Sequence, residues 1–249
     1  MATRAQFLAR IKAEVAKSSG AFPASSAARP ARPLEAAIAI RRQMAERWPE
    51  ALDRFRAEFE KVAGVFHRVS TSAEVPGAVI AIARDKSARE VVAWDPASLG
   101  LDLGPPLAAS GLPVRAAAPD DTSETARRRH RDEAARADVG VTGVDVALAE
   151  TGTLILLSGA GRPRSTSLLP ATHVAVFDRR HLVESLEQVG VLLEAVHADP
   201  RATSGAMINF ITGPSRTADI ELTLTRGVHG PKEVHAIFVD EPLGSEDWS

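Results

Sequence analysis

Apolar residues recur with helical spacing in the first quarter of the chain. The spacing predicts a short amphipathic helix over residues 3–17 and a longer helix over residues 34–63, with a break at Pro49. Residues 18–33, which lie between them, are rich in Ser, Ala and Pro, a composition typical of a linker. The first helix is therefore expected to be an extension joined to the rest of the chain by this linker.

Short apolar runs alternate with helical segments from residue 64 onward. The runs predict strands over residues 65–69, 90–94, 112–117, 173–177, 207–212 and 235–239. Helices are predicted over residues 72–86, 123–137 (capped by Asp121 or Thr122) and 180–196. Residues 144–149 and 153–158 predict a hairpin, because both are β-rich and a Gly-containing turn separates them. The alternation favours an α/β domain with a parallel or mixed sheet. The expected boundaries are residues 1–33 for the extension and residues 34–249 for the domain.

Composition narrows the chemistry that the chain can perform. The 249 residues include no cysteine, which excludes a disulfide, a thiolate nucleophile and a Cys-ligated zinc or iron–sulfur cluster held by this chain alone. The formal net charge is -2 and only 4% of residues are aromatic, so we expect no nucleic-acid partner. No apolar run approaches the roughly 20 residues of a membrane span, and no secretory signal is present, so we expect a cytoplasmic protein. The seven histidines lack metal-ligand spacing, and no metal site is predicted.

Two segments of the second half carry candidate chemistry. Glu150 stands at a strand end beside Thr151 and Gly152, where a carboxylate can act as an acid, a base or a nucleophile; the alternative is a solvated turn residue. Residues 158–166 contain Gly159 and Gly161 with flanking arginines and hydroxyls, which favours a backbone nest for an anion. The alternative for this second segment is a flexible surface loop.

A third segment, residues 211–221, directly follows a predicted strand. Ligands of open α/β sheets bind beyond the carboxyl ends of strands, so this position suits a site. Its candidate binding residues are Gly213, Ser215, Arg216 and Thr217, and Asp219 supplies a carboxylate. Polar and apolar residues alternate from residue 217 to residue 225, which indicates a strand; a short helix capped by Ser215 is the alternative. His229 follows between two glycines, where a histidine can act as a general acid or base if it faces the cleft; the alternative is an exposed turn residue.

The ordered set of these motifs resembles the LUD-domain family, most closely its lactate-utilization C branch. The similar stretches are residues 140–143, 149–153, 158–161, 169–173, 212–221 and 227–231, and the resemblance covers nearly the whole chain. It implies a three-layer α/β/α fold similar to the NagB/RpiA/CoA-transferase group. It also implies a role beside the lactate utilization iron–sulfur proteins A and B, all three proteins being required for oxidation of L-lactate to pyruvate. The iron–sulfur clusters are then expected in those partners, with no cofactor bound by this chain.

Three hypotheses follow for the function. In the first, the chain is the non-redox subunit of the lactate-oxidising system: Arg216 holds a small anionic substrate, and Glu150, Asp219 or His229 moves its hydroxyl proton. In the second, it is a stand-alone enzyme acting on a phosphorylated, CoA-linked or folate-type molecule. In the third, it only assembles the complex. The predicted catalytic residues are Glu150, Asp219 and His229. The predicted substrate- or anion-binding residues are Thr151, Gly152, Gly159, Gly161, Gly213, Ser215, Arg216 and Thr217.

Overall fold

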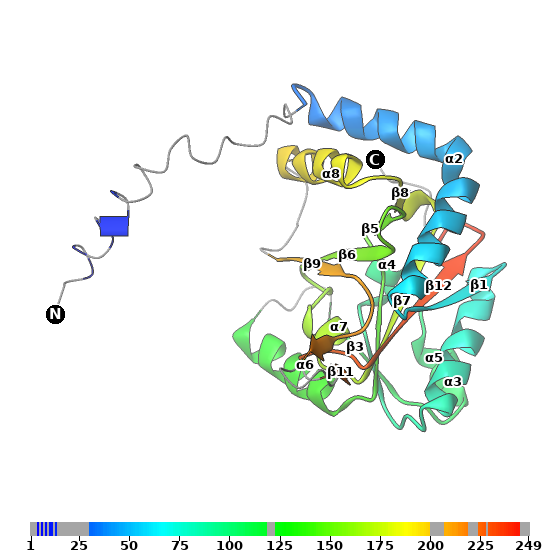
Figure 1. Ribbon diagram of the computed structural model, residues 1–249. Helices are drawn as coiled ribbons and strands as arrows, with labels where there is room; N and C mark the ends of the chain where they lie inside the picture. Colours follow the sequence, from blue (N-terminus) through cyan, green and yellow to red (C-terminus); the bar gives the residue numbers. More distant parts are fainter. Residues whose placement is uncertain are drawn as a thin grey trace.

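Six parallel strands form the central sheet, in the order β1-β12-β7-β4-β2-β3 (Figure 1). They are β1 (Val65–Val69), β2 (Val91–Ala93), β3 (Val114–Ala116), β4 (Val139–Thr142), β7 (Thr172–Asp178) and β12 (Glu233–Val239). This computed structural model describes residues 30–118, 123–199, 207–218, 224–227 and 229–244, with some positions from 4 to 13. Every residue of β4 and β7 is buried, as is typical of parallel strands covered on both faces.

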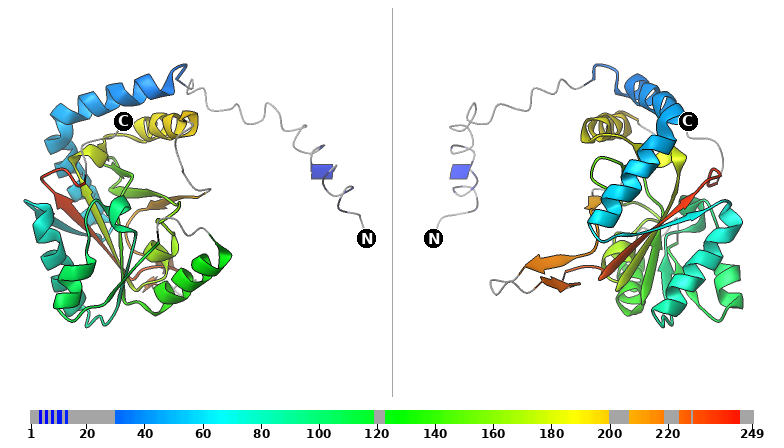
Figure 2. Two further views of the ribbon diagram at one scale, coloured as in Figure 1. Left: turned by 180° about the vertical axis from the view of Figure 1, so that it is seen from behind. Right: turned by 45° about the vertical axis from the view of Figure 1, so that its right-hand side comes forward.

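Helices cover both faces of this sheet, which makes the domain a three-layer α/β/α structure, as predicted. Helices α3 (Val75–Asp85) and α5 (Gly104–Ala109) lie on one side, and α6 (Glu124–Arg136) and α7 (Ser165–Leu168) lie on the other (Figures 1 and 2). The second half of α2 (Pro33–Lys61) packs on β7 and β12. There the rings of Phe55 and Phe177 lie 5.3 Å apart, and those of Trp48 and Phe238 lie 5.9 Å apart. These aromatic contacts anchor the core.

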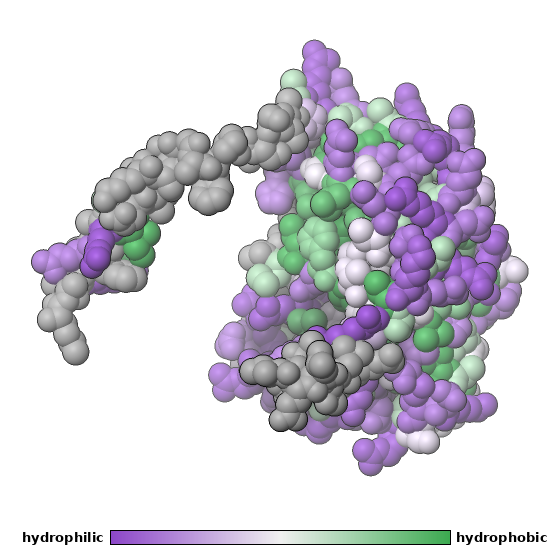
Figure 3. Space-filling view, viewed as in Figure 1, coloured by the Kyte–Doolittle hydropathy of each residue, from purple (hydrophilic) through white to green (hydrophobic). Residues whose placement is uncertain are grey.

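A second, smaller sheet has the strand order β8-β5-β6-β9. Its strands are β8 (Leu182–Val183), β5 (Val146–Leu148), β6 (Thr153–Leu157) and β9 (Ile208–Ile211). The antiparallel β5–β6 pair confirms the predicted hairpin. Helix α8 (Leu186–Ala198) packs beside this sheet and against α2. Apolar side chains gather over α8 and β9 on the face seen in Figure 3, and Phe210 in the edge strand β9 is half exposed.

Strands β10 (Arg216–Ala218) and β11 (Leu224–Arg226) form an antiparallel hairpin that projects from the body (Figure 2). The predicted single strand over residues 217–225 is therefore wrong, and so is the alternative helix. Arg216 pairs with Arg226, so the chain reverses between the two strands instead of continuing in one direction. Asp219, one of the predicted catalytic residues, lies outside the described residues.

Three further details of the helices differ from the prediction. Pro49 lies inside α2, which continues through it; the predicted break is a change of direction (Figure 1), because proline removes one hydrogen bond without ending the helix. Helix α8 begins at Leu186, since residues 179–183 form a 3-10 turn and then β8. Helix α6 is capped by Ser123, whose hydroxyl accepts from the Ala126 amide at 3.1 Å.

The first unit is described only in part. Each described position from residue 4 to residue 13 is helical, as predicted, and most of the predicted linker lies outside the described residues. Within the part of the chain that the structure describes, no helix is both long and apolar enough to cross a membrane.

The strand order places a topological switch point between β2 and β4. From β2 the chain proceeds outward to β3 at the edge of the sheet. From β4 it proceeds the other way, through the second sheet to β7. Connections that diverge in this way leave a crevice beyond the carboxyl ends of the two strands, which is where ligands bind in open α/β sheets.

Candidate functional site

A crevice of about 270 Å³ lies beyond the carboxyl ends of β2 and β4; we call it the switch-point crevice. Trp94 follows β2 and Asp145 follows β4, while His181 comes from the turn after β7. The wall is completed by Arg162, Arg180 and the turn of α4 (Pro96–Leu99). Five segments distant in sequence therefore meet at this one edge of the sheet, since Leu243 and Gly244 also line the crevice.

Buried charges surround the switch-point crevice. Arg162 contacts Asp145 at 2.8 Å, and Arg180 contacts Asp178 at 2.7 Å. Arg41, from α2, donates to the backbone carbonyl of Arg180 and lies close enough to both carboxylates to interact with their charges. Of these groups, Asp145, Arg162 and Arg180 line the crevice itself. The guanidinium groups of Arg162 and Arg180 are of the kind that binds a small carboxylate.

The two carboxylates are held in different electrostatic environments. Burial raises the pKa of Asp145, although Arg162 and the Leu157 amide oppose that effect. Burial also acts to raise the pKa of Asp178, but hydrogen bonds from His181 and Arg180 outweigh it and hold that pKa well below its usual range. Asp178 is therefore a fixed anion, whereas Asp145 is the better proton acceptor of the two.

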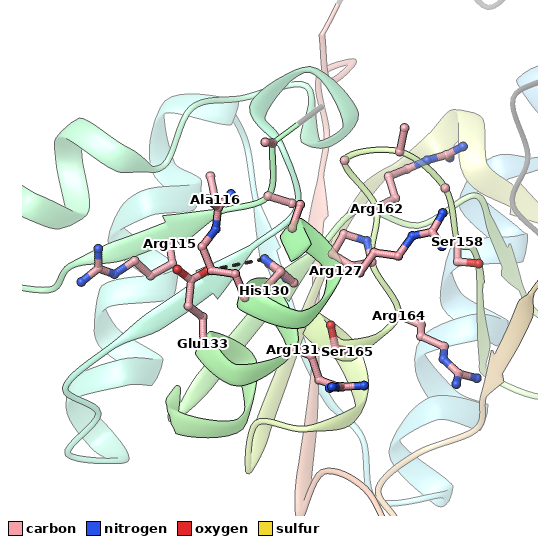
Figure 4. A pocket seen from close by; sticks show the side chains of 18 of the residues that line it. Arg115, Ala116, Arg127, His130, Arg131, Glu133, Ser158, Arg162, Arg164 and Ser165 are labelled. Atoms are coloured by element: carbon pink, nitrogen blue, oxygen red, sulfur yellow. Dashed lines mark ion pairs between the residues drawn. The ribbon is translucent and has the colours of Figure 1, made fainter. Parts of the chain in front are cut away.

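A larger cleft of about 1170 Å³ lies beside the crevice; we call it the arginine cleft. It is bounded by α6, by the end of β3 and by the loop of residues 158–165 (Figure 4). Its lining contains six arginines, which are Arg115, Arg127, Arg129, Arg131, Arg162 and Arg164. Two glutamates, Glu124 and Glu133, share that lining. Arg162 lines both cavities and so stands in the wall between them.

The loop of residues 158–165 is fixed to the end of β2. The Asp95 amide donates to the Gly161 carbonyl at 3.0 Å, and the Trp94 indole donates to the Pro163 carbonyl at 3.3 Å. Gly159 and Arg162 exchange two backbone hydrogen bonds of 3.1 Å each. These hydrogen bonds fix the conformation of the loop, which forms one wall of the cleft. The alternative prediction for this segment was a flexible surface loop.

Two of the sequence-predicted site residues, Gly159 and Gly161, lie in the lining of the arginine cleft. Glu150, Thr151 and Gly152 lie elsewhere, at the β5–β6 turn. There Glu150 accepts a hydrogen bond of 2.9 Å from the Leu186 amide at the start of α8. The three residues are absent from the described lining of both cavities. The contacts of Glu150 are those of a residue that fixes a turn against a helix end.

The third predicted segment lies near the amino ends of the central strands. Arg216 donates to the Val62 carbonyl just after α2, and the Ser215 amide donates to the Pro231 carbonyl ahead of β12. Gly213 packs on the same Val62 carbonyl. The segment does follow a strand, but that strand, β9, belongs to the second sheet, so the argument from the carboxyl edge fails. Thr217 belongs to β10.

His229 is exposed, and its neighbour Gly230 packs on Ser215. The structure therefore brings the residue 213–216 segment and the residue 229–231 segment together. It places both outside the described lining of the two cavities.

Sequence reasoning missed the charged residues of the switch-point crevice. A local signal existed for Asp145, which is a charge inside the apolar run of residues 144–149. For Asp178 the signal was a carboxylate ending a buried strand, followed directly by Arg179, Arg180 and His181. Arg41 carried no signal, because it stands within a long helix with many other charged residues.

Comparison with protein families and known proteins gives consistent matches. The family model described as LUD domain matches residues 52–239. Lactate utilization protein C of Halalkalibacterium halodurans is 44% identical over 114 residues, which cover 44% of this chain and 47% of that protein. Lactate utilization protein C of Geobacillus sp. is 40% identical over 121 residues, covering 47% of this chain and 48% of that protein. The chain spans about half the length of the curated relatives it matches.

A solved structure of similar fold is a DUF162 family protein from Deinococcus radiodurans. The match has a TM-score of 0.51 and a sequence identity of 24%, and it covers 77% of this chain and 98% of that chain. At this identity the likeness shows the fold alone, and it agrees with the three-layer arrangement described above.

Proposed function

The chain belongs to the LUD-domain family, and from that premise we propose that it acts in lactate utilization as a component that binds a small carboxylate. It works with the iron–sulfur proteins A and B in the oxidation of L-lactate to pyruvate, and it does so without a redox centre of its own. Similarity to proteins named lactate utilization protein C supports the pathway. The absence of cysteine from the chain fits a division of labour in which the partners hold the clusters.

The observation that carries the binding role is that two guanidinium groups, those of Arg162 and Arg180, line the switch-point crevice. Arg162 uses one nitrogen, Nη1, for its 2.8 Å contact with Asp145, and a guanidinium group can bind a ligand carboxylate through its other donors. The volume of about 270 Å³ is at the small end of ligand cavities, which suits a three-carbon acid. The position beyond β2 and β4 is the binding position of this class of sheet.

Asp145 supplies the acid–base group in this proposal. Oxidation of an alcohol to a ketone removes two electrons and two protons. In this proposal the two electrons and the C–H proton pass to the iron–sulfur partners, and the hydroxyl proton needs an acceptor. Burial raises the pKa of Asp145, which makes its carboxylate a stronger base than an exposed one. Arg162, 2.8 Å away, steadies the Asp145 carboxylate and presents its remaining donors to the crevice.

Genetic complementation tests the proposal. Deletion of the gene, in a strain with no second copy, should abolish growth on L-lactate, and the intact gene should restore it. Asp145→Asn should fail to restore growth while yielding a protein that elutes and melts as a folded domain. Arg54→Gln is the control, because Arg54 is exposed on α2 away from both cavities. Normal growth of the deletion strain, or full rescue by Asp145→Asn, contradicts the proposal.

The residues predicted from the sequence enter the same assay as alternatives. If Glu150, Asp219 or His229 moves the proton, Glu150→Gln, Asp219→Asn or His229→Gln loses complementation with the fold intact. If all three variants and Asp145→Asn complement, the chain only assembles the complex. Co-purification of the intact chain with proteins A and B then distinguishes an assembly role from no role in the system.

A further inference from the structure

The arginine cleft carries more positive charge than a carboxylate substrate requires. We propose that it binds a phosphorylated small molecule with at least two negative charges. This site goes beyond the carboxylate site proposed above: it lies on the other side of Arg162, between α6 and the loop of residues 158–165 (Figure 4).

Most of the arginines in the cleft lack a carboxylate partner. Arg115 contacts Glu90 at 3.0 Å and Arg162 contacts Asp145, so these two are neutralised. The side chains of Arg127, Arg131 and Arg164 form no ion pair or hydrogen bond with any of the residues that the structure describes. Unpaired guanidinium groups gathered around one cavity repel one another, and a bound multivalent anion removes that repulsion.

The two glutamates of the lining do not balance these arginines. Glu133 lies 3.9 Å from the His130 ring, on the side of α6 that faces Arg115 (Figure 4). Glu124 stands in the first turn of α6, and its charge is favourable to that helix end. Arg127 leaves the same helix toward the loop, where Arg164 also lies in the cleft lining. An anion between helix and loop therefore meets guanidinium groups from both walls.

The walls of the cleft are already in place. The loop is attached to β2 through Asp95 and Trp94, as described above, and α7 is attached to α6 by the His130–Thr166 hydrogen bond of 3.0 Å. Ser165 lies in the cleft lining between these two attachments. A preformed site of this kind needs little ordering of its backbone on binding, which favours affinity.

Size and chemistry decide the ligand class. The volume of about 1170 Å³ is at the upper end of small-molecule cavities and far exceeds a lone carboxylate. Guanidinium groups match the oxygens of phosphate in pairs, and a phosphate dianion satisfies two of them at once. The recognition that the described lining supports is therefore recognition of the phosphate.

Isothermal titration of the full chain tests this site, with the ionic strength held constant. The probes are inorganic phosphate, inorganic pyrophosphate and glycerol 3-phosphate, each titrated into the wild type, Arg127→Gln, Arg164→Gln and the control Arg54→Gln. We expect saturable binding to the wild type and to the control, weakened about tenfold or more by each cleft substitution. Preference for glycerol 3-phosphate over the two inorganic ions assigns the site to an organic phosphate, and the reverse preference assigns it to an inorganic one.

Two results overturn the proposal. The first is no saturable binding of any of the three probes by the wild type. The second is equal binding by the cleft variants and Arg54→Gln, which places the anion elsewhere. A parallel titration with L-lactate keeps the two sites distinguishable, because Asp145→Asn should affect lactate and Arg127→Gln should affect phosphate. Loss of phosphate binding alone would contradict the phosphate site and leave the carboxylate site supported, and loss of lactate binding alone would do the reverse.

Discussion

Gly161 lines the arginine cleft and lies against Asp95, and its substitution is the sharpest test of how the loop of residues 158–165 is held. Its φ is +68°, a left-handed conformation that an L side chain rarely adopts. A Cβ at this position would lie 2.1 Å from Asp95 Oδ2, well inside van der Waals contact. Asp95 cannot simply yield, because its carboxylate accepts hydrogen bonds of 3.0 Å and 3.2 Å from the Ala97 and Ser98 amides.

The cost of Gly161→Ala follows from these two effects. The left-handed conformation costs an alanine about 1–2 kcal/mol. Displacing Asp95 removes the N-cap of α4, which costs about a further 1–2 kcal/mol. The sum, about 2–4 kcal/mol, is a large share of the free energy of unfolding of a typical domain.

Urea unfolding followed by circular dichroism measures this loss, and Gly111→Ala separates its two parts. Gly111 has a φ of +78°, but a Cβ there would meet nothing within 4 Å, so only the conformational cost applies. We expect Gly161→Ala to lose about 1–2 kcal/mol more than Gly111→Ala. Equal losses in the two variants would refute the view that the Gly161–Asp95 contact holds the loop.

Three further predictions concern stability. Asp145→Ala should cost about 3 kcal/mol in urea unfolding, because Arg162 and the Leu157 amide lose their acceptor, whereas Asp145→Asn keeps an acceptor for that amide and should cost less. Burial lowers the pKa of His173 from 6.5 to about 3, so between these pH values the unfolded chain binds a proton that the folded chain excludes. The free energy of unfolding should therefore fall as the pH drops from 6.5 toward 3. His173→Gln should reduce this pH dependence. Ser123→Ala should lower the free energy of unfolding by about 1 kcal/mol, since it removes the α6 cap; an unchanged urea midpoint would contradict that role.

The elements of the fold were accessible from the sequence because each is specified over a short stretch. Strand β1 has the predicted bounds, and β7 extends its prediction by a single residue at each end. Both are apolar runs bounded by polar or turn residues, and that signal is local. The prediction failed where a neighbour in space decides, as at Leu186, where β8 pairs with β5 and delays the start of α8. The sequence of residues 180–196 contains no local signal for that pairing.

The residues of the switch-point crevice could not be predicted from the sequence, because their contacts join segments that are far apart in the chain. Arg41 and Asp178 are 137 positions apart and become neighbours only because α2 packs over the end of β7. Asp145 and Arg162 are nearer in sequence, but a hairpin and a loop must both fold before they meet at 2.8 Å. The order of strands in a sheet is set by burial of the whole chain, and no window of residues contains it.

The same topology explains why Glu150 and His229 do not lie together in the described lining of either cavity. Both stand at glycine-containing turns, and a turn is equally visible in the sequence whichever edge of the sheet it occupies. Only the strands that lead into it decide the edge: β5 carries the chain away from the crevice toward Glu150, and β12 begins just after His229. Residues that follow a central strand, as Asp145 follows β4, reach the carboxyl edge instead. A carboxylate after such a strand is therefore a better candidate for catalysis than a carboxylate at a hairpin turn, even when the turn carries the more conspicuous motif.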